Sequence, residues 1–350
     1  MLRRHHRKFA LATLGISVLM VSACSDGGDR TSTTATTTAT TEAPTTTVKP
    51  LKKLDVAVVT PSAENDLAFT QSMVDALKLV ATERGADGMS LQVSPQMFDV
   101  EKARAEVERY TSEGVDVIFA HGSQYGDIVK EAAAAHPDIT FAWGTASDTF
   151  GLPNVYAYTV AADQGGYVLG VLAAELTESG NIGVVGPVEV GDAKLYTDGF
   201  VKGVTETKPT VKTGVTYIGS FSDVVKAGEA AKEFTAGGAD VLTGSSQAMS
   251  GAVPVAVSAG AAWFGNQASY TALAPDAVVA SQVYHFEDTV RQVLQNTERG
   301  VAGGQTFTLT LANDGLVIEY NPDYELPSAA RQKADAAEAR IEAASPEAAS

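Results

Sequence analysis

Residues 54–59 read LDVAVV, and an amphipathic stretch over residues 68–84 follows them and ends at Gly85. The first stretch is almost continuously apolar, which predicts a β-strand that is buried on both faces. The second stretch has the apolar spacing of an α-helix with a glycine at its end. Because a buried strand followed by a helix is the repeating unit of a parallel sheet, this region indicates an α/β fold.

The same alternation continues along the chain. The next strands are predicted from residue 91 and at 115–120, 140–143 and 155–159, with helices at 100–113 and 125–135. A second cycle follows, with helices at 164–178, 196–205, 225–236, 253–259 and 287–299 and strands at 181–185, 215–218, 241–242, 262–264 and 278–282. Two doubly wound cycles in series predict two Rossmann-like lobes.

The end of the chain is predicted to form a two-stranded ribbon and a helix. Residues 306–311 and 316–320 flank the turn Asn313-Asp314-Gly315, which favours a hairpin, and residues 326–344 are amphipathic. We expect a leader over 1–23, a lipidated cysteine and tether over 24–50, one lobe over 51–159, a second over 160–283, and a return to the first lobe with a C-terminal helix over 284–350.

The first 24 residues have the pattern of a bacterial lipoprotein leader. Four basic residues precede an apolar stretch over 9–21 that is too short to span a bilayer comfortably. Val21-Ser22-Ala23 places small residues before Cys24, the single cysteine of the chain, and this lipobox-like pattern predicts lipid attachment there. The alternative is a lone apolar cysteine in a leader that is cleaved further on. Residues 25–50 are dominated by threonine, so we expect a disordered tether.

The charge balance of the chain is strongly acidic. The sequence has 25 Lys and Arg against 42 Asp and Glu, a net charge of −17. Loss of the leader makes the net charge four units more negative, because the leader holds four basic residues and no acidic one. Such a chain lacks the basic face that nucleic-acid binding and adhesion to anionic lipid need. The acidic balance favours solubility of the domain and disfavours a strongly anionic ligand. We expect the lipid-anchored protein to be a monomer.

The predicted fold places a ligand between the two lobes. Ligands of open α/β sheets bind beyond the carboxyl ends of the strands, so two lobes that face each other enclose a cleft, and domain closure buries its contents. After the first strand come Asn65, Asp66, Phe69 and Thr70. Asp66 is either a helix cap or a ligand contact, and Phe69 is either a packing residue or a platform on which a flat ligand stacks.

Further candidates follow the other strands. In the first half these are Gln124, Tyr125, Trp143 and Thr145, where Trp143 either packs under the loop 147–153 or lines the cleft. In the second half and at the crossover they are Gln247, Asn266, Tyr284 and His285. Amide, hydroxyl and aromatic groups dominate these positions and Lys and Arg are rare. This chemistry favours a neutral, flat solute that forms hydrogen bonds, such as a nucleobase or nucleoside.

Motifs of catalysis are missing from the sequence. Beyond the leader only His121, His136 and His285 remain, and they lack the spacing of a metal site. There is no G-x-S-x-G, phosphate-binding loop or H-x-x-E-H motif. The sequence therefore predicts a binding protein without catalytic activity, cofactor or metal.

Several runs of the sequence resemble the BMP family, the basic membrane lipoproteins or PnrA-like binding proteins. The matching runs are 65–71 (NDLAFTQ), 164–174 (QGGYVLGVLAA), 180–186 (GNIGVVG), 199–204 (GFVKGV), 219–223 (GSFSD) and 238–241 (GADV), in family order between residues 54 and 320. The resemblance implies a type I periplasmic-binding-protein fold and uptake of nucleosides or purine bases through an ABC permease. It also implies that Phe69 stacks on the base, with Asn65 and Asp66 beside it.

The sequence departs from many nucleoside-binding members of that family. Pro61 stands where they have Asp, Gly265-Asn266-Gln267 replaces a loop with Asp, and Tyr284 lies near the position of a Lys. In the family those Asp and Lys side chains often hold ribose hydroxyls, so their loss implies a ligand without ribose or one that is held differently. Of these, the resemblance favours a free base. A receptor of the same fold for a sugar or amino acid, and a sensor that signals to a membrane partner, are the alternatives.

Overall fold

The stretch LDVAVV forms strand β1 (Leu54–Val59) within a six-stranded sheet of the computed structural model, which describes residues 53–345. Val56 and Val58 pack against helices on one face of this sheet, and Ala57 and Val59 pack against helices on the other. This alternation explains why the strand is apolar at almost every position. The predicted leader, the lipidation site at Cys24 and the tether lie outside the described residues.

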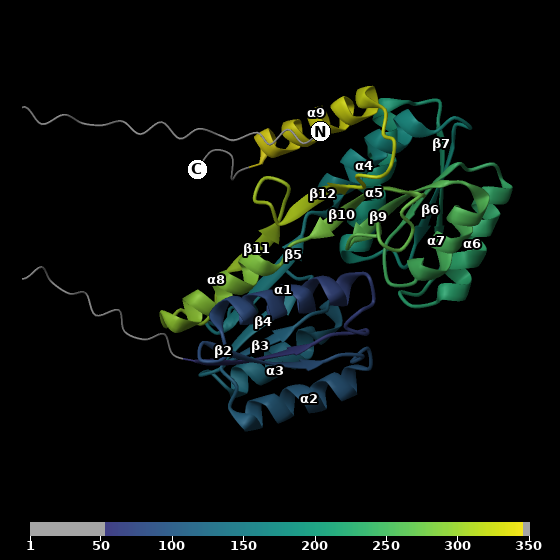
Figure 1. The fold of residues 1–350 in the computed structure, drawn as a ribbon. Helices are drawn as coiled ribbons and strands as arrows, with labels where there is room; N and C mark the ends of the chain where they lie inside the picture. Colours follow the sequence, from purple (N-terminus) through teal and green to yellow (C-terminus); the bar gives the residue numbers. More distant parts are fainter. Residues whose placement is uncertain (1–52, 346–350) are drawn as a thin grey trace, which may run out of the picture. The chain divides into compact units, whose positions relative to one another are not determined.

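The first sheet is parallel throughout (Figure 1). Its strand order is β11 (Thr306–Leu309), β5 (Val155–Val160), β4 (Thr140–Gly144), β3 (Val117–Ala120), β1 and β2 (Met89–Ser94). Helices α1 (Phe69–Arg84) and α8 (Glu287–Glu298) pack on one face, and α2 (Val100–Glu113) and α3 (Gly126–Ala135) pack on the other, with the short 3-10 turn η1 (Ser123–Tyr125) before α3.

The second sheet repeats this plan with one antiparallel edge strand. Its order is β12 (Leu316–Tyr320), β10 (Val278–Tyr284), β9 (Ala262–Gln267), β8 (Val241–Gly244), β6 (Asn181–Gly186) and β7 (Lys212–Tyr217), where β12 runs antiparallel to β10. Helices α4 (Ala162–Leu176) and α5 (Gly191–Thr207) cover one face, and α6 (Val224–Ala236) and α7 (Met249–Ala259) cover the other. The predicted α/β fold with two Rossmann-like lobes is confirmed.

The predicted ribbon of residues 306–311 and 316–320 is wrong. β11 pairs with β5 in the first sheet, and β12 pairs with β10 in the second. Each strand thus pairs with the edge strand of a different sheet and becomes the new edge of that sheet. Asn313 closes the turn between them, because its Oδ1 accepts hydrogen bonds from the N–H groups of Thr310 (2.9 Å) and Gly315 (3.1 Å).

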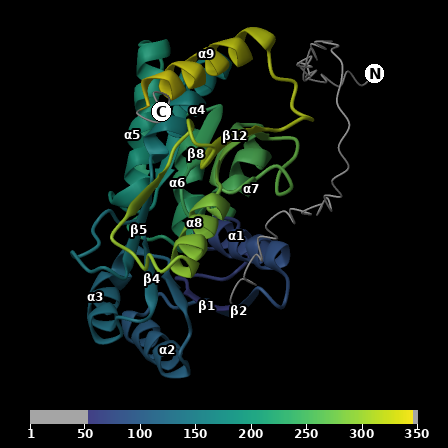
Figure 2. The ribbon, with the colours of Figure 1, turned by 90° about the vertical axis from the view of Figure 1, so that its left-hand side faces the viewer.

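The chain crosses between the lobes three times, at β5 to α4, at β10 to α8 and at β11 to β12. Residues beyond 284 are therefore divided, because α8 and β11 lie with the first sheet, whereas β12 and the closing helix α9 (Ser328–Ala344) lie with the second. Figure 2 shows α9 beside α4. Among residues 53–345, no helix is long and apolar enough to cross a membrane.

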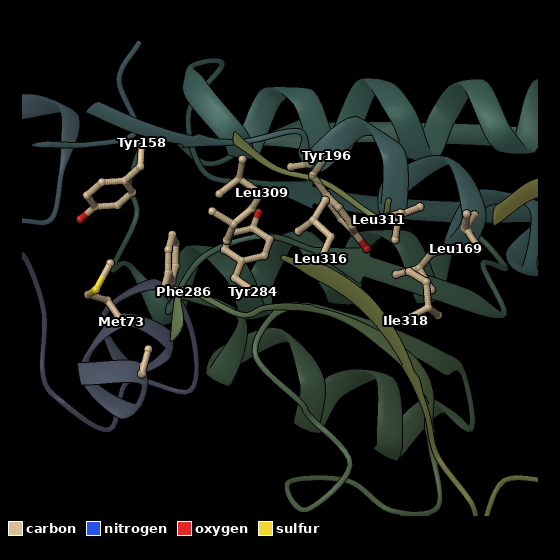
Figure 3. Packing of buried hydrophobic residues seen from close by; sticks show 14 of the residues in the cluster. Met73, Tyr158, Leu169, Tyr196, Tyr284, Phe286, Leu309, Leu311, Leu316 and Ile318 are labelled. Carbon is tan, nitrogen blue, oxygen red and sulfur yellow. The ribbon is translucent and has the colours of Figure 1, made fainter. Parts of the chain in front are cut away.

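One hydrophobic cluster runs through the crossovers and joins the two lobes. It includes Met73 of α1 and Tyr158 of β5 on the first lobe and Leu169 of α4 on the second, and Figure 3 shows Tyr284 and Phe286 between them. Tyr284 and Phe286 are both nearly inaccessible to solvent. This continuous core holds the two lobes together at the crossovers.

Candidate ligand-binding site

A cavity of about 100 Å³ lies between the lobes, at the carboxyl ends of the parallel strands of both sheets. The first lobe lines it with Pro61, Phe69, Phe98, Gly122, Ser123, Gln124 and Thr145. The second lobe lines it with Val190, Gly191, Asp192, Phe221, Gln247 and Gln267. Of the predicted site residues, the structure brings Phe69, Gln124, Thr145 and Gln247 together around this cavity.

A larger hollow of about 680 Å³ lies elsewhere, between α4, α5 and the end of α9. Exposed side chains such as Lys202 and Glu206, which are 4.0 Å apart, form part of its wall. Its residues lie along helix faces and not at the ends of strands. The cavity between the lobes is therefore the candidate site.

Phe69 is held against the wall of the cavity by His121, which follows β3. The two rings stack with their centroids 3.7 Å apart and their planes 13° from parallel. His121 is fully buried, whereas Phe69 is partly exposed and lines the cavity. One face of Phe69 is thus covered by the imidazole, and this leaves the ring fixed at the cavity as a flat apolar surface.

The hydrogen bonds of His121 define its tautomer. Its Nε2 lies 2.9 Å from the carbonyl oxygen of Phe69, which can only accept, so Nε2 carries the proton and donates. Its Nδ1 then accepts from the hydroxyl of Tyr158 at 2.9 Å. Burial lowers the pKa of His121 to about 3, outweighing the opposing effect of its bond to Phe69. The imidazole is therefore neutral and serves as a rigid support.

Asp192 is the acidic residue of the opposite wall. It opens helix α5, and its Oδ2 accepts hydrogen bonds from Nε2 of Gln267 (3.2 Å) and from the hydroxyl of Tyr284 (3.1 Å). Burial raises the pKa of Asp192, although the bonds from Gln267 and Tyr284 act in the opposite direction. Burial also raises the pKa of Tyr284 well above its ordinary value, so the phenol keeps its proton and remains a donor.

Asp66 and Thr70 are used within the first loop. Oδ1 of Asp66 accepts from the backbone N–H groups of Ala68 (2.9 Å) and Gln71 (3.0 Å), which fixes the start of α1. Thr70 is fully buried, and its hydroxyl forms a hydrogen bond with the hydroxyl of Ser62 at 2.8 Å. The helix-start alternative for Asp66 thus matches the geometry, and neither residue is among those that line the cavity.

Tyr125 and Trp143 support the wall from behind. The hydroxyl of Tyr125 donates to the carbonyl of Met97 at 2.8 Å. Trp143 stacks on Phe150 with ring centroids 4.9 Å apart, and its Nε1 donates to the carbonyl of Gly122 at 3.1 Å. Trp143 therefore packs under the loop that contains Phe150, and through Gly122 it positions one lining residue.

Asn266 belongs to a buried amide cluster at the crossover. Its Nδ2 donates to the hydroxyl of Ser245, and its Oδ1 accepts from Nε2 of Gln282, both at 2.9 Å. Tyr284 reaches the cavity indirectly, through Asp192. Asn65 and His285 are exposed and lie outside the lining. Direct ligand contacts from these residues stay predictions.

Backbone strain marks both lobes at the cavity. Thr145 has φ 55° and Gln267 has φ 76°, in the left-handed region that side-chain-bearing residues seldom adopt. Both residues line the cavity. Strained conformations of this kind persist where the surrounding structure over-determines them, and they gather at binding sites.

Sequence reasoning missed Asp192, Gln267, Phe221 and the support role of His121. Asp192 follows a glycine at the start of a helix, a position that reads as an ordinary acidic first turn. Only its hydrogen bond from the buried Tyr284, 92 residues away, distinguishes Asp192 from an ordinary acidic residue at a helix start. Phe221 stands in the run 219–223 (GSFSD), which the sequence singled out as a family landmark and which could have identified it.

The charge of the lining is also distinctive. Asp192 is the one charged residue among the described residues that line the cavity, and none of them is Lys, Arg or His. Within residues 53–345, no group of three or more His, Cys, Asp or Glu is arranged to hold a metal ion. The arrangement offers a flat apolar surface on one lobe and hydrogen-bond acceptors on the other.

Comparison with known proteins identifies the family. Residues 53–343 match the model of the Bmp family, described as PnrA-like substrate-binding proteins of ABC transporters. The chain is 26% identical over 294 residues to a purine-binding protein of Brucella abortus, covering 83% of this chain and 81% of that protein. It is 28% identical over 193 residues to a nucleoside-binding protein of an ABC transporter from Lactococcus lactis, covering 54% of each chain.

Solved structures share the fold. A solute-binding protein of an ABC transporter from Conexibacter woesei superposes with a TM-score of 0.70 at 23% identity, over 82% of this chain and 96% of that chain. One from Aeropyrum pernix superposes with a TM-score of 0.72 at 18% identity, over 83% and 91%. The resemblance found in the sequence is confirmed, and the chain belongs to the family of PnrA-like substrate-binding proteins of ABC transporters.

Proposed function

We propose that the cavity binds a purine-type nucleobase, which stacks on the free face of Phe69. The observation that carries this proposal is the Phe69–His121 pair, because a buried imidazole 3.7 Å behind the ring holds it flat against the cavity. Phe221 lines the same cavity from the second lobe and provides an apolar surface there when the lobes close. Aromatic surfaces of this kind suit the flat face of a base.

The size of the cavity favours a base without its sugar. A volume of about 100 Å³ is well below the roughly 300–1,000 Å³ that drug-sized ligands occupy. The absence of Lys, Arg and His among the described lining residues disfavours phosphate and carboxylate groups. The purine-binding relative from Brucella abortus supports the same ligand class. Stacking with a few buried hydrogen bonds is consistent with a dissociation constant of about 1 μM, near −8 kcal/mol.

We further propose that Cys24 carries a lipid that keeps the mature protein at the membrane surface. The small residues before Cys24 and the apolar leader support this, and an anchored binding protein stays near its permease. Cys24→Ser removes the thiol that would be alkylated. We expect this variant to lose lipid-dependent partition into detergent, whereas a processed Cys24→Ser protein that remains membrane-bound would contradict the anchor.

A thermal-shift screen tests the ligand proposal. The purified protein is freed of carried-over ligand by unfolding and refolding and is then mixed with nucleobases, nucleosides, sugars or amino acids. A ligand that binds only the folded state raises the melting temperature, and at 100 times its dissociation constant it adds about 2.7 kcal/mol. We expect a rise with purine bases. A rise with sugars or amino acids alone would reject the nucleobase and keep the transport class.

A further inference from the structure

The wall opposite Phe69 presents two neighbouring groups of oxygen acceptors. Asp192 and Gln267 both line the cavity, and Nε2 of Gln267 donates to Oδ2 of Asp192 at 3.2 Å. A carboxylate only accepts hydrogen bonds, so the amide nitrogen of Gln267 must face Asp192. This fixes the orientation of the amide and leaves its oxygen for another partner.

The amide oxygen of Gln267 has no partner within the described residues. Gln267 is 4% exposed, and its Oε1 is buried without a hydrogen bond. Buried polar atoms are nearly always satisfied, because an unpaired one costs about 1–3 kcal/mol. Because Gln267 lines the cavity, a donor on a ligand enclosed by closure of the lobes is the partner that this buried acceptor lacks.

Asp192 lies beside it at the wall of the cavity. Gln267 and Tyr284 donate to its Oδ2, and the backbone N–H groups of residues 192 and 193 also act on the carboxylate. A carboxylate offers about four lone-pair sites, and no side chain of the described residues is bonded to Oδ1. No cation stands among the described lining residues to neutralise the charge. Ligand N–H groups would therefore compensate a carboxylate that burial already disfavours.

We propose that Asp192 and Gln267 determine specificity by accepting hydrogen bonds from a ligand edge with two adjacent N–H donors. In a purine, such an edge is a ring N–H beside an exocyclic amino group, as in guanine. This inference rests on the proposed binding of a nucleobase and names the edge that the second lobe recognises. A ligand that presents a carbonyl or an anionic group would place its oxygen against the acceptor oxygens of Asp192 and Gln267, with no proton between them. A site with buried acceptors rejects such ligands strongly.

The test compares guanine with hypoxanthine, which differ only by the exocyclic amino group. Binding is measured by competition calorimetry on the refolded wild-type protein and on the Asp192→Asn variant. Asn still accepts from Tyr284 and Gln267, so the fold is retained, but its amide group replaces one acceptor oxygen with a donor. Asp198→Asn is the matched control, because Asp198 lies on the same helix, pairs with Lys194 on the exposed face and is outside the cavity.

We expect wild type and Asp198→Asn to bind guanine roughly tenfold or more tightly than hypoxanthine. In Asp192→Asn this ratio should fall toward one, mainly through weaker guanine binding. Gln267→Met, which removes the second acceptor, should lower the ratio as well. Equal affinities in wild type, or an unchanged ratio in Asp192→Asn, would overturn the inference while leaving nucleobase binding in place. Failure of every purine to bind the wild-type protein would overturn both this inference and the proposed binding of a nucleobase.

Discussion

The ring of His121 stacks on the ring of Phe69 at 3.7 Å while its Nε2 donates to the carbonyl of the same residue at 2.9 Å. One histidine therefore fixes both the ring and the backbone of Phe69. A stacking surface that is already immobile loses little conformational freedom when a ligand arrives, and this raises affinity. The pair couples a residue after β3 to the first turn of α1 across the floor of the cleft.

Replacing Phe69 by Leu should weaken binding of a purine base while preserving the fold. Leucine still covers His121 but has no flat π-face, and base–aromatic stacking contributes about 1–3 kcal/mol, or roughly a 5- to 150-fold change in dissociation constant. Titration calorimetry measures this change. Phe307→Leu removes an aromatic ring stacked on Tyr156 outside the cavity and should bind as wild type. Equal affinity of Phe69→Leu and Phe307→Leu would reject the stacking role.

Acid should destabilise the protein through His121. Burial lowers the pKa of His121 to about 3 in the folded state, whereas an unfolded histidine titrates near about 6.5. Between these values the unfolded chain binds a proton that the folded chain refuses, so stability is lost as pH falls, by up to about 1.4 kcal/mol per pH unit. Denaturant unfolding at several pH values measures this slope.

His121→Gln should reduce that acid slope, because glutamine can donate to Phe69 and accept from Tyr158 without titrating. His285→Gln, which removes an exposed imidazole, is the matched control and should unfold with the slope of wild type. The same pH dependence in both variants and wild type would mean that another group causes the acid sensitivity.

Asp192→Asn should stabilise the ligand-free protein at neutral pH. Burial raises the pKa of Asp192, so its ionised form costs stability above that pKa, and the cost disappears as pH falls through it. We expect a gain of about 0.5–2 kcal/mol at pH 7 that shrinks toward pH 4. The free energy of unfolding in urea at both pH values checks this. A variant less stable than wild type at pH 7 would show that the charge contributes favourably to the empty cavity.

Gly170→Ala should destabilise the second lobe. A Cβ at Gly170 of α4 would lie 2.2 Å from the carbonyl oxygen of Phe200 on α5, so the helices must move apart, at a cost of about 1–3 kcal/mol. Gly237→Ala, whose Cβ would meet backbone oxygens at 3.3 Å after α6, is the control and should change stability little. Thermal unfolding compares the two, and equal stability would mean that the α4–α5 contact can relax.

Most of the fold could be predicted from the sequence, but less of the binding site could. Strand β1 has the predicted bounds. An apolar run that is followed by a glycine-terminated helix is the repeating unit of a parallel sheet, so the local pattern was enough to predict it. The ribbon of residues 306–320 was wrong because the choice of partner strand depends on which sheet edges are open, and no local pattern records that. Phe69 could be predicted from its place after the first strand.

Asp192 could not be predicted in the same way. Its role depends on Tyr284 and Gln267, which lie 92 and 75 residues further along the chain. Likewise, His121 reads as a loop residue until β3 brings it against Phe69, 52 residues before it. Trp143, predicted either to pack under the loop 147–153 or to line the cleft, donates to Gly122, and Asn266, predicted as a ligand contact, donates to Ser245. Buried N–H groups need an acceptor within the protein, and direct contact of either residue with a ligand stays a prediction.

Titration calorimetry of a free purine base and its nucleoside into the refolded wild-type protein tests the central claim most directly. We predict saturable binding of the base at one site, with a dissociation constant of about 1 μM, a negative heat-capacity change and no gain from the ribose. Saturable binding of a sugar or amino acid with no heat from any purine base or nucleoside would contradict it.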